Sequence, residues 1–376
     1  MSLVAGFLVV NNQQEMLLIK RYYLNTNKMI QNLLKSLLLI LICGLIGCTT
    51  PEKHKKEVAE TMPKMEYPTT GSIEVILPEL NDIIPPDAKI EVLTEEKFLW
   101  SEGPLWISEL NAVIFSDVPA NKIYKWSEKD GLSTFLSPSG TNGQDVSPNE
   151  SGSNGLTLNN SDQLVLAQHG NRQISLMDAP LNAPKPAYKA LAAKYEGKQF
   201  NSPNDVIFDK SGNMYFTDPP YGLKDQDDSK DKELAFNGVY KVDTAGNITV
   251  ITDKLTRPNG LAFSPDEKTL YVANSDSNNA IWMAYSFNED GSISESLFFD
   301  ATSMVPNNLG LPDGLRVGDN GIIYATGPGG VLIFSPEGKH LGTINTGKAT
   351  ANCELVGDQN VLYMTAHQQL MRIKLK

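Results

Sequence analysis

Six short segments of the sequence begin with an oxygen-bearing side chain and continue into an apolar run. The first residues of these segments are Glu102, Asn154, Asn204, Asn259, Asp313 and Asn352. They follow one another at intervals of 39 to 55 residues, and each is a carboxylate or a carboxamide. A fold that brought them together would form a site for a hard cation such as Ca²⁺ or Mg²⁺, and Mn²⁺ suits it less well. Taken alone, an Asn-Gly or Asp-Gly pair is more often a turn, so the recurrence in a shared register favours ligation.

The segments around these residues indicate how the chain could bring them together. Each is followed by a turn, a second apolar run about ten residues on, and two further short runs, for example 206–208, 214–216, 238–242 and 248–251. The runs lack a helical period and read as strands. Four-stranded units repeated around an axis form a β-propeller. The sequence therefore predicts an all-β fold, a six-bladed β-propeller over residues 87–376. The regular spacing disfavours the alternative, a stack of β-sandwiches.

The end of the chain supports closure of the ring. Only three strand-like runs follow Asn352, and one unassigned run, 89–93, precedes Glu102. We expect this N-terminal strand to complete the last blade, because an open sheet would leave two unpaired edges. The first strand of each blade lies nearest the axis, so the six oxygen-bearing residues should meet at one level of the central channel.

The N-terminal region reads as a targeting segment. Lys35 precedes the apolar run 37–46, which ends in small residues, as in a secretory signal. The tetrad 45–48 is similar to a bacterial lipobox, which implies cleavage before Cys48 and a lipid on its sulfur. An ordinary cleaved signal and an uncleaved anchor are the alternatives. The prediction is a signal segment over 1–47 with Met29 as an alternative start, a flexible tether over 48–86, and a lipid-anchored domain in the bacterial cell envelope, facing the periplasm or the surface.

Composition excludes several classes of function. The chain has 32 Lys and Arg residues against 44 Asp and Glu, a net charge of −12, which disfavours nucleic acid as a partner. Three cysteines cannot form a disulfide framework, and no Cys/His cluster indicates a zinc site. The sequence also contains no phosphate-binding glycine loop and no G-x-S-x-G nucleophile elbow.

Four motifs resemble the signature positions of the senescence-marker-protein, gluconolactonase and luciferin-regenerating-enzyme family. They are Glu102-Gly103-Pro104, Ser202-Pro203-Asn204-Asp205, Arg257-Pro258-Asn259-Gly260 and Pro312-Asp313-Gly314. The resemblance covers about residues 90–376, and the segments 153–156, 168–172 and 217–222 are similar to the bacterial gluconolactonase branch. It implies a six-bladed propeller with one divalent metal, whose ligands would be Glu102, Asn204, Asn259 and Asp313. Ca²⁺ is the expected ion, with Mg²⁺, Mn²⁺ and Zn²⁺ as alternatives.

The resemblance also implies a metal-dependent hydrolase that opens a sugar lactone. The metal would polarise the ring carbonyl while water attacks it. Asp313 is the catalytic candidate, because it is the only acid besides Glu102 at the axial level; a role as general base, a role as nucleophile and water activated by the metal stay open. The expected substrate-binding residues are Asn154, His169, Arg172 and Tyr221.

Two other functions remain as alternatives at this point. One is an esterase or phosphotriesterase that uses the same metal site. The other is a non-catalytic propeller that binds a sugar or a protein. The lactonase interpretation predicts a small-molecule lactone as the partner, no nucleic acid, and membrane contact through the N-terminal lipid alone.

Overall fold

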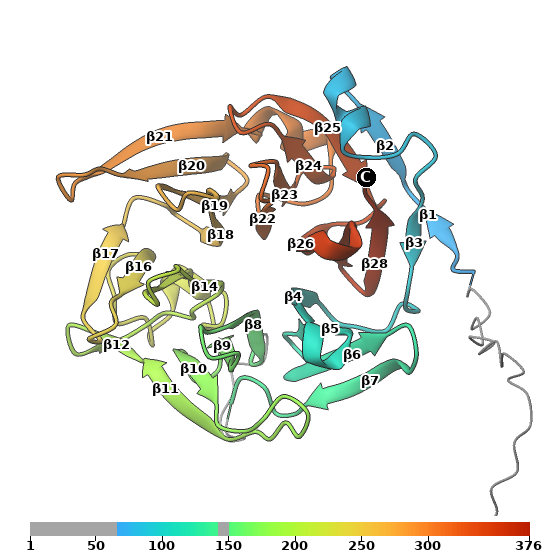
Figure 1. Cartoon of the computed structure of the whole chain (residues 1–376). Coiled ribbons are helices and arrows are strands. Elements are labelled where there is room, and N and C mark those ends of the chain that lie inside the picture. The colour runs from blue at the N-terminus through green and yellow to red at the C-terminus, as the bar shows by residue number, and fades with distance from the viewer. Residues whose placement is uncertain (1–65, 142–149) are drawn as a thin grey trace, which may run out of the picture. The chain divides into compact units, whose positions relative to one another are not determined.

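A computed structural model describes residues 66–141 and 150–376. In these residues, six antiparallel sheets of four or five strands surround a central axis as blades, each with one strand nearest the axis, and a separate two-stranded sheet lies outside them (Figure 1). Their helical content consists of short 3-10 turns, and none of their helices is long and apolar enough to cross a membrane. The six-bladed β-propeller predicted from the repeats is confirmed.

Each blade runs from its innermost strand outward. Blade 1 is β4 (Ser101–Ile107), β5 (Ala112–Asp117), β6 (Lys122–Ser127) and β7 (Gly131–Leu136). Blade 2 is β8 (Ser153–Leu158), β9 (Leu164–Gln168), β10 (Gln173–Met177) and β11 (Tyr188–Ala192). Blade 3 is β14 (Val206–Phe208), β15 (Met214–Asp218), β16 (Gly238–Val242) and β17 (Ile248–Thr252). Blade 4 is β18 (Pro258–Phe263), β19 (Thr269–Asp276), β20 (Asn279–Phe287) and β21 (Ile293–Asp300).

The last two blades include strands from the N-terminal part of the propeller. Blade 5 is β22 (Leu315–Val317), β23 (Ile323–Gly327), β24 (Gly330–Phe334) and β25 (His340–Asn345), extended by β2 (Ser72–Val75). Blade 6 is β26 (Thr350–Val356), β27 (Val361–Ala366) and β28 (Gln369–Lys374), extended by β3 (Ile90–Val92) and β1 (Thr69–Thr70). The remaining elements are β12 (Lys194–Tyr195), β13 (Lys198–Gln199), η1 (Pro78–Asp82), η2 (Ser108–Leu110), η3 (Gln226–Asp228), η4 (Thr302–Asn307) and η5 (Gly357–Gln359).

The ring closes through β3, as the sequence predicted. This strand pairs antiparallel with β28, placing Ile90 opposite Ile373 and Val92 opposite Met371. β3 is therefore the fourth strand of blade 6, and the N-terminal and C-terminal parts of the propeller share one sheet (Figure 1). Closure of this kind removes the exposed edges that would otherwise pair with other chains.

The flexible tether expected up to residue 86 differs from the structure over residues 66–86. β2 pairs with β25 and β1 pairs with β3, while η1 buries Leu80 in a cluster that also holds Ile84 and Tyr324. The strands β1 and β2 have only two and four residues, which is too short for an alternating pattern to be recognised in the sequence. The expected signal segment 1–47, residues 48–65 and the lipidation site Cys48 lie outside the described residues.

Among the described residues, six hydrophobic clusters hold the blades together, one between each pair of neighbours. Between blades 1 and 6, for example, Trp126 and Phe115 pack with Tyr363, and the rings of Trp106 and Tyr363 stack with centroids 6.0 Å apart. Burying a large apolar side chain contributes about 1.5–3 kcal/mol, so each interface is a substantial part of the folding free energy. The aromatic residues of this cluster thus pack between neighbouring blades.

Candidate functional site

The inner strands are irregular where the oxygen-bearing residues lie. Pairing of β4 with β5 shifts register between Glu102 and Leu105, and similar shifts occur in β8, β18 and β26. In blades 3 and 5 the inner strands begin only at Val206 and Leu315, after Asn204 and Asp313. Because a bulge redirects side chains away from the regular alternation, these residues need not follow the inward and outward pattern of a ladder.

Glycine after these residues allows neighbouring inner strands to approach closely. Gly103 has a φ of +49°, and a Cβ at this position would lie 2.2 Å from the carbonyl oxygen of Asn154. The Gly155 N–H donates to the carbonyl of Asn204 over 2.7 Å, which joins blade 2 directly to blade 3. These contacts hold the inner strands of blades 1, 2 and 3 close together beside the oxygen-bearing residues.

Glu102 is a buried carboxylate with three hydrogen-bond donors around it. Its Oε1 accepts from Trp100 Nε1 at 3.3 Å, and its Oε2 accepts from the Gly103 N–H at 3.1 Å and from Asn352 Nδ2 at 3.4 Å. Burial raises the pKa of Glu102 to about 8, and the nearby charge of Asp205 adds to the shift, while the three donors oppose it. Without a counter-charge the carboxyl is therefore largely protonated at neutral pH.

Asp313 lies at the start of blade 5, two blades away from Glu102 around the ring, and is near enough to be affected by the charge of Glu102. Burial raises the pKa of Asp313 well above its ordinary value, the charge of Glu102 raises it further, and a hydrogen bond with the Asn259 side chain acts in the other direction. Its Oδ1 is buried and has no hydrogen-bond partner within the described part of the chain. Two neighbouring buried carboxyl groups cannot both be ionised unless a positive charge lies between them.

These residues fit a hard cation. Glu102 and Asp313 supply carboxylate charge, Asp313 Oδ1 lacks a partner, and Asn259 supplies an amide beside it. Asn204 and Asn259 are 2% and 5% exposed, and the Asn204 backbone lies beside Gly155. No group of three or more His, Cys, Asp or Glu side chains able to hold a metal occurs in residues 66–141 and 150–376, so amide oxygens would have to complete the coordination.

A cavity of about 350 Å³ gives access to Asp313. It is lined by Trp100, Ser275, Ser277, Val305, Gly310, Leu311, Asp313, Ala349 and Thr350. Tyr221 borders the same region. Its hydroxyl interacts with the side chains of Ser275 and Asn259, and the charge of Asp313 raises its pKa. Burial raises the pKa of Tyr221, so the hydroxyl stays neutral and can donate a hydrogen bond.

The other three predicted substrate-binding residues lie in different environments. Arg172 donates from Nε to the carbonyls of Phe200 and Asn201 at 2.7 and 3.2 Å, so it supports the loop that leads to Asn204, and its Nη2 is buried with no partner among the described residues. Asn154 is 4% exposed, and its carbonyl accepts a hydrogen bond from Ser116 Oγ at 2.8 Å. His169 is fully buried, with Nδ1 3.1 Å from Oε2 of Glu150.

Sequence reasoning missed a layer of charges next to the axial residues. Arg316 Nε donates to Glu354 Oε2 at 2.8 Å, and Arg316 Nη2 donates to the Pro104 carbonyl at 3.4 Å. Burial raises the pKa of the nearby Asp205, and the positive charge of Arg316 opposes that shift. Asp205 stands where four other repeats have glycine (Gly103, Gly155, Gly260 and Gly314). Two features of the sequence could have indicated these charges. One is this departure from the repeat, and the other is the presence of charged residues inside strands that are otherwise apolar.

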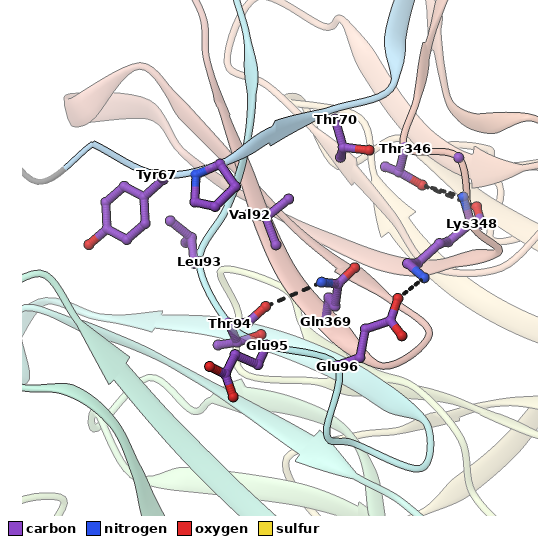
Figure 2. Close-up of a pocket in the computed structure, with 12 residues that line it drawn as sticks. Tyr67, Thr70, Val92, Leu93, Thr94, Glu95, Glu96, Thr346, Lys348 and Gln369 are labelled. Atoms are coloured by element: carbon purple, nitrogen blue, oxygen red, sulfur yellow. Dashed lines mark hydrogen bonds and ion pairs between the residues drawn. The ribbon is translucent and has the colours of Figure 1, made fainter.

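A larger cavity of about 730 Å³ lies at the seam between blades 5 and 6, and none of the predicted site residues lines it. Lys348 Nζ pairs with Glu96 Oε1 over 2.5 Å, and Gln369 Nε2 donates to the Thr94 carbonyl over 3.3 Å (Figure 2). The ion pair is partly exposed to solvent. The ion pair connects the loop before β26 to the segment after β3, and the Gln369 hydrogen bond connects β28 to that segment, so the cavity belongs to the ring closure.

Comparisons with known proteins show the family and the fold of the chain. The family model for the SMP-30/gluconolactonase/LRE-like region matches residues 100–368. A gluconolactonase from Zymomonas mobilis is 39% identical over 323 residues, covering 83% of this chain and 88% of the relative. The solved structure of a gluconolactonase from Xanthomonas campestris is similar with a TM-score of 0.71 and 28% identity, covering 84% of this chain and 99% of that one. A calcium-binding regucalcin from Agrobacterium tumefaciens, 17% identical with a TM-score of 0.56 over 75% of this chain and 92% of that one, shares the fold. The resemblance seen in the sequence is confirmed, and the chain belongs to the SMP-30/gluconolactonase/LRE-like family.

Proposed function

We propose that this protein hydrolyses cyclic carboxylic esters, and sugar lactones in particular, at the axial site of the propeller. The observation that carries the proposal is a pair of carboxyl groups whose pKa values are raised, Glu102, which is 2% exposed, and Asp313, which is half-buried in the wall of a cavity with its Oδ1 buried. The 39% identity to a gluconolactonase over most of both chains supports lactone chemistry rather than another ester.

A divalent cation would be held by Glu102, Asn204, Asn259 and Asp313, with Ca²⁺ preferred because all the donors are oxygen atoms. When bound, it would supply a positive charge that stabilises the oxyanion formed from the ring carbonyl.

The chain's own residues would carry out the remaining steps. Asp313 is the proposed acceptor of the proton of the attacking water, because it is the acid that lines the cavity. Tyr221, whose hydroxyl interacts with the side chains of Ser275 and Asn259, would donate a hydrogen bond to the substrate. His169, Arg172 and Asn154 would complete the binding site.

The direct test combines metal analysis of the purified protein with a pH-drop assay on a panel of aldonolactones, simple lactones, aryl esters and phosphotriesters. We expect one divalent ion per chain and faster turnover of aldonolactones than of the other substrates. Asp313→Asn should lower kcat by about 10²-fold or more, because it removes the proton acceptor while keeping the shape of the side chain.

Asp319→Asn is the matched control, since Asp319 is exposed in the turn after β22 and should leave turnover unchanged. The proposal is wrong if the metal-loaded protein opens no lactone, or if phosphotriesters are turned over faster than every lactone.

We also propose that the mature protein begins at a lipidated Cys48 and is held at the bacterial cell envelope. The support is the sequence alone, namely the apolar run 37–46 followed by the lipobox-like tetrad 45–48.

A further inference from the structure

His169 is the least satisfied polar side chain near the axial site. Its side chain is fully buried, and neither ring nitrogen makes a hydrogen bond to any residue that the structure describes. Glu150 Oε2 lies 3.1 Å from Nδ1, close enough for an ion pair although outside hydrogen-bond geometry. Leaving a buried imidazole unsatisfied costs free energy, so such a group calls for a functional explanation.

A purely structural histidine in the same chain looks different. His340, in blade 5, has its Nε2 3.0 Å from the Gly342 carbonyl and 3.1 Å from Thr343 Oγ1. That ring is half-buried and partnered within its own strand. His169 combines deeper burial with a neighbouring carboxylate and an Nε2 that has no partner among the described residues, which is the arrangement of an oriented acid or base.

Two neighbours of His169, the turn that contains Tyr221 and the side chain of Glu150, link it to Asp313. A Cβ at Gly222 would lie 2.7 Å from His169 Cβ, so His169 packs against the turn that contains Tyr221. The charge of Asp313 in turn raises the pKa of Tyr221, so the two side chains are close. Glu150, which lies beside His169 Nδ1, is near enough to Asp313 that its charge raises the pKa of that carboxyl. His169 therefore contacts two segments, the turn with Tyr221 and Glu150, whose side chains both interact electrostatically with Asp313.

We propose that Glu150 and His169 form a dyad in which Glu150 holds the imidazolium and His169 Nε2 protonates the oxygen that leaves the lactone ring. Glu150 is thus a positioning residue and His169 a catalytic one. This assignment rests on the proposed lactone hydrolysis, and it adds an acid to a reaction in which Asp313 is the proposed base.

Every proton in the proposed step is accounted for. Water forms a bond to the carbonyl carbon and gives one proton to Asp313. The bond between the carbonyl carbon and the ring oxygen then breaks, its electron pair goes to that oxygen, and the oxygen takes the proton from His169 Nε2. The product acid ionises, His169 recovers a proton as Asp313 releases its own, and one proton per turnover enters the solvent.

The test uses two δ-lactones whose leaving oxygens differ in how much they need protonation by an acid. In glucono-δ-lactone the ring oxygen leaves as an alkoxide, which needs a proton from an acid. In dihydrocoumarin the ring oxygen leaves as a phenolate, which is stable without that proton. Phenyl acetate replaces dihydrocoumarin if the bicyclic ring does not enter the cavity. We expect His169→Gln to lower kcat on gluconolactone by about 10²-fold or more, the range of a lost general acid, and to change kcat on the phenolic substrate by only a few fold. Glu150→Gln should shift the ratio in the same direction by less, since the imidazole remains.

The ratio of the two rates in one sample is independent of the fraction of folded protein, so a folding defect cannot imitate the result. His340→Gln is the matched control and should leave the ratio unchanged. An equal loss on both substrates, or no loss in His169→Gln, overturns the dyad. Wild-type protein that opens neither substrate contradicts the proposed function itself, which is a separate result.

Discussion

Among single residues, Glu102 and Asp313 matter most to the proposed site, because burial raises the pKa of both carboxyl groups. They come from blades 1 and 5, and the charge of Glu102 raises the pKa of Asp313. Each is far from the other in sequence and is oriented by a bulge or by the start of a short strand. Their shared burial costs folding free energy, and a bound cation would offset that cost.

The raised pKa of Glu102 predicts how stability depends on pH when a chelator removes divalent ions. The folded state holds this proton up to about pH 8, whereas the unfolded chain releases it near the ordinary value of 4.5. The folded state therefore binds more protons between these pH values, and the free energy of unfolding should fall as pH rises from 4.5 to 8. Urea unfolding in chelator at several pH values measures this slope.

Glu102→Gln should have a shallower slope, because the amide does not titrate. Added Ca²⁺ should stabilise the wild type most at the upper end of this range, where the carboxylates are free of protons. Identical slopes for the wild type and Glu102→Gln would mean that Glu102 is not the group responsible.

At the scale of elements, the N-terminal segment is part of two blades. β3 supplies the fourth strand of blade 6, β2 extends blade 5, and η1 buries Leu80 beside Ile84. The loop around Lys348 and the segment around Glu96 meet at the same seam (Figure 2). The seam is the place where the ring is held closed without a covalent link.

A pair of truncations tests this arrangement. A chain that starts at residue 66 keeps β1, β2 and η1 and should melt at the same temperature as one that starts at residue 49. A chain that starts at residue 87 keeps β3 but loses the burial of Leu80 and Ile84, each worth about 1.5–3 kcal/mol, and should melt at a clearly lower temperature. Equal melting temperatures for the starts at 66 and 87 would show that η1 and β2 contribute little to stability.

At the scale of the whole molecule, the proposed N-terminal lipid determines where the propeller resides. The lipid proposed on Cys48 would attach a domain of net negative charge to the cell envelope, and residues 49–65 would separate it from the membrane.

Labelling with radioactive palmitate in a bacterial host tests the anchor. Wild-type protein should incorporate the label and partition into detergent, and Cys48→Ser should not, since it lacks the sulfur that receives the lipid. Cys43→Ser, five residues earlier in the same apolar segment, is the matched control and should be labelled normally. Equal labelling of Cys48→Ser and the wild type, or no label in the wild type, would refute the anchor.

The repeated pattern determined most of the fold, because each blade is a local unit. The turn and strand signals of segments such as 206–216 lie within a few dozen residues, and the count of runs after Asn352 indicated that a strand near residue 90 must close the ring. The family could be recognised from the same short motifs. The two and four residues of β1 and β2 carried too little pattern to be recognised.

Only the tertiary structure decided which groups meet. The sequence put six oxygen-bearing residues in equivalent positions, but it did not show that Asn352 donates to Glu102 or that Arg172 supports the loop before Asn204. It also gave no reason to pair Glu150 with His169, or Arg316 with Glu354. The physical reason is that local pattern reports which way a strand buries its faces, whereas the charge, burial and partners of a channel residue depend on side chains contributed by several other blades.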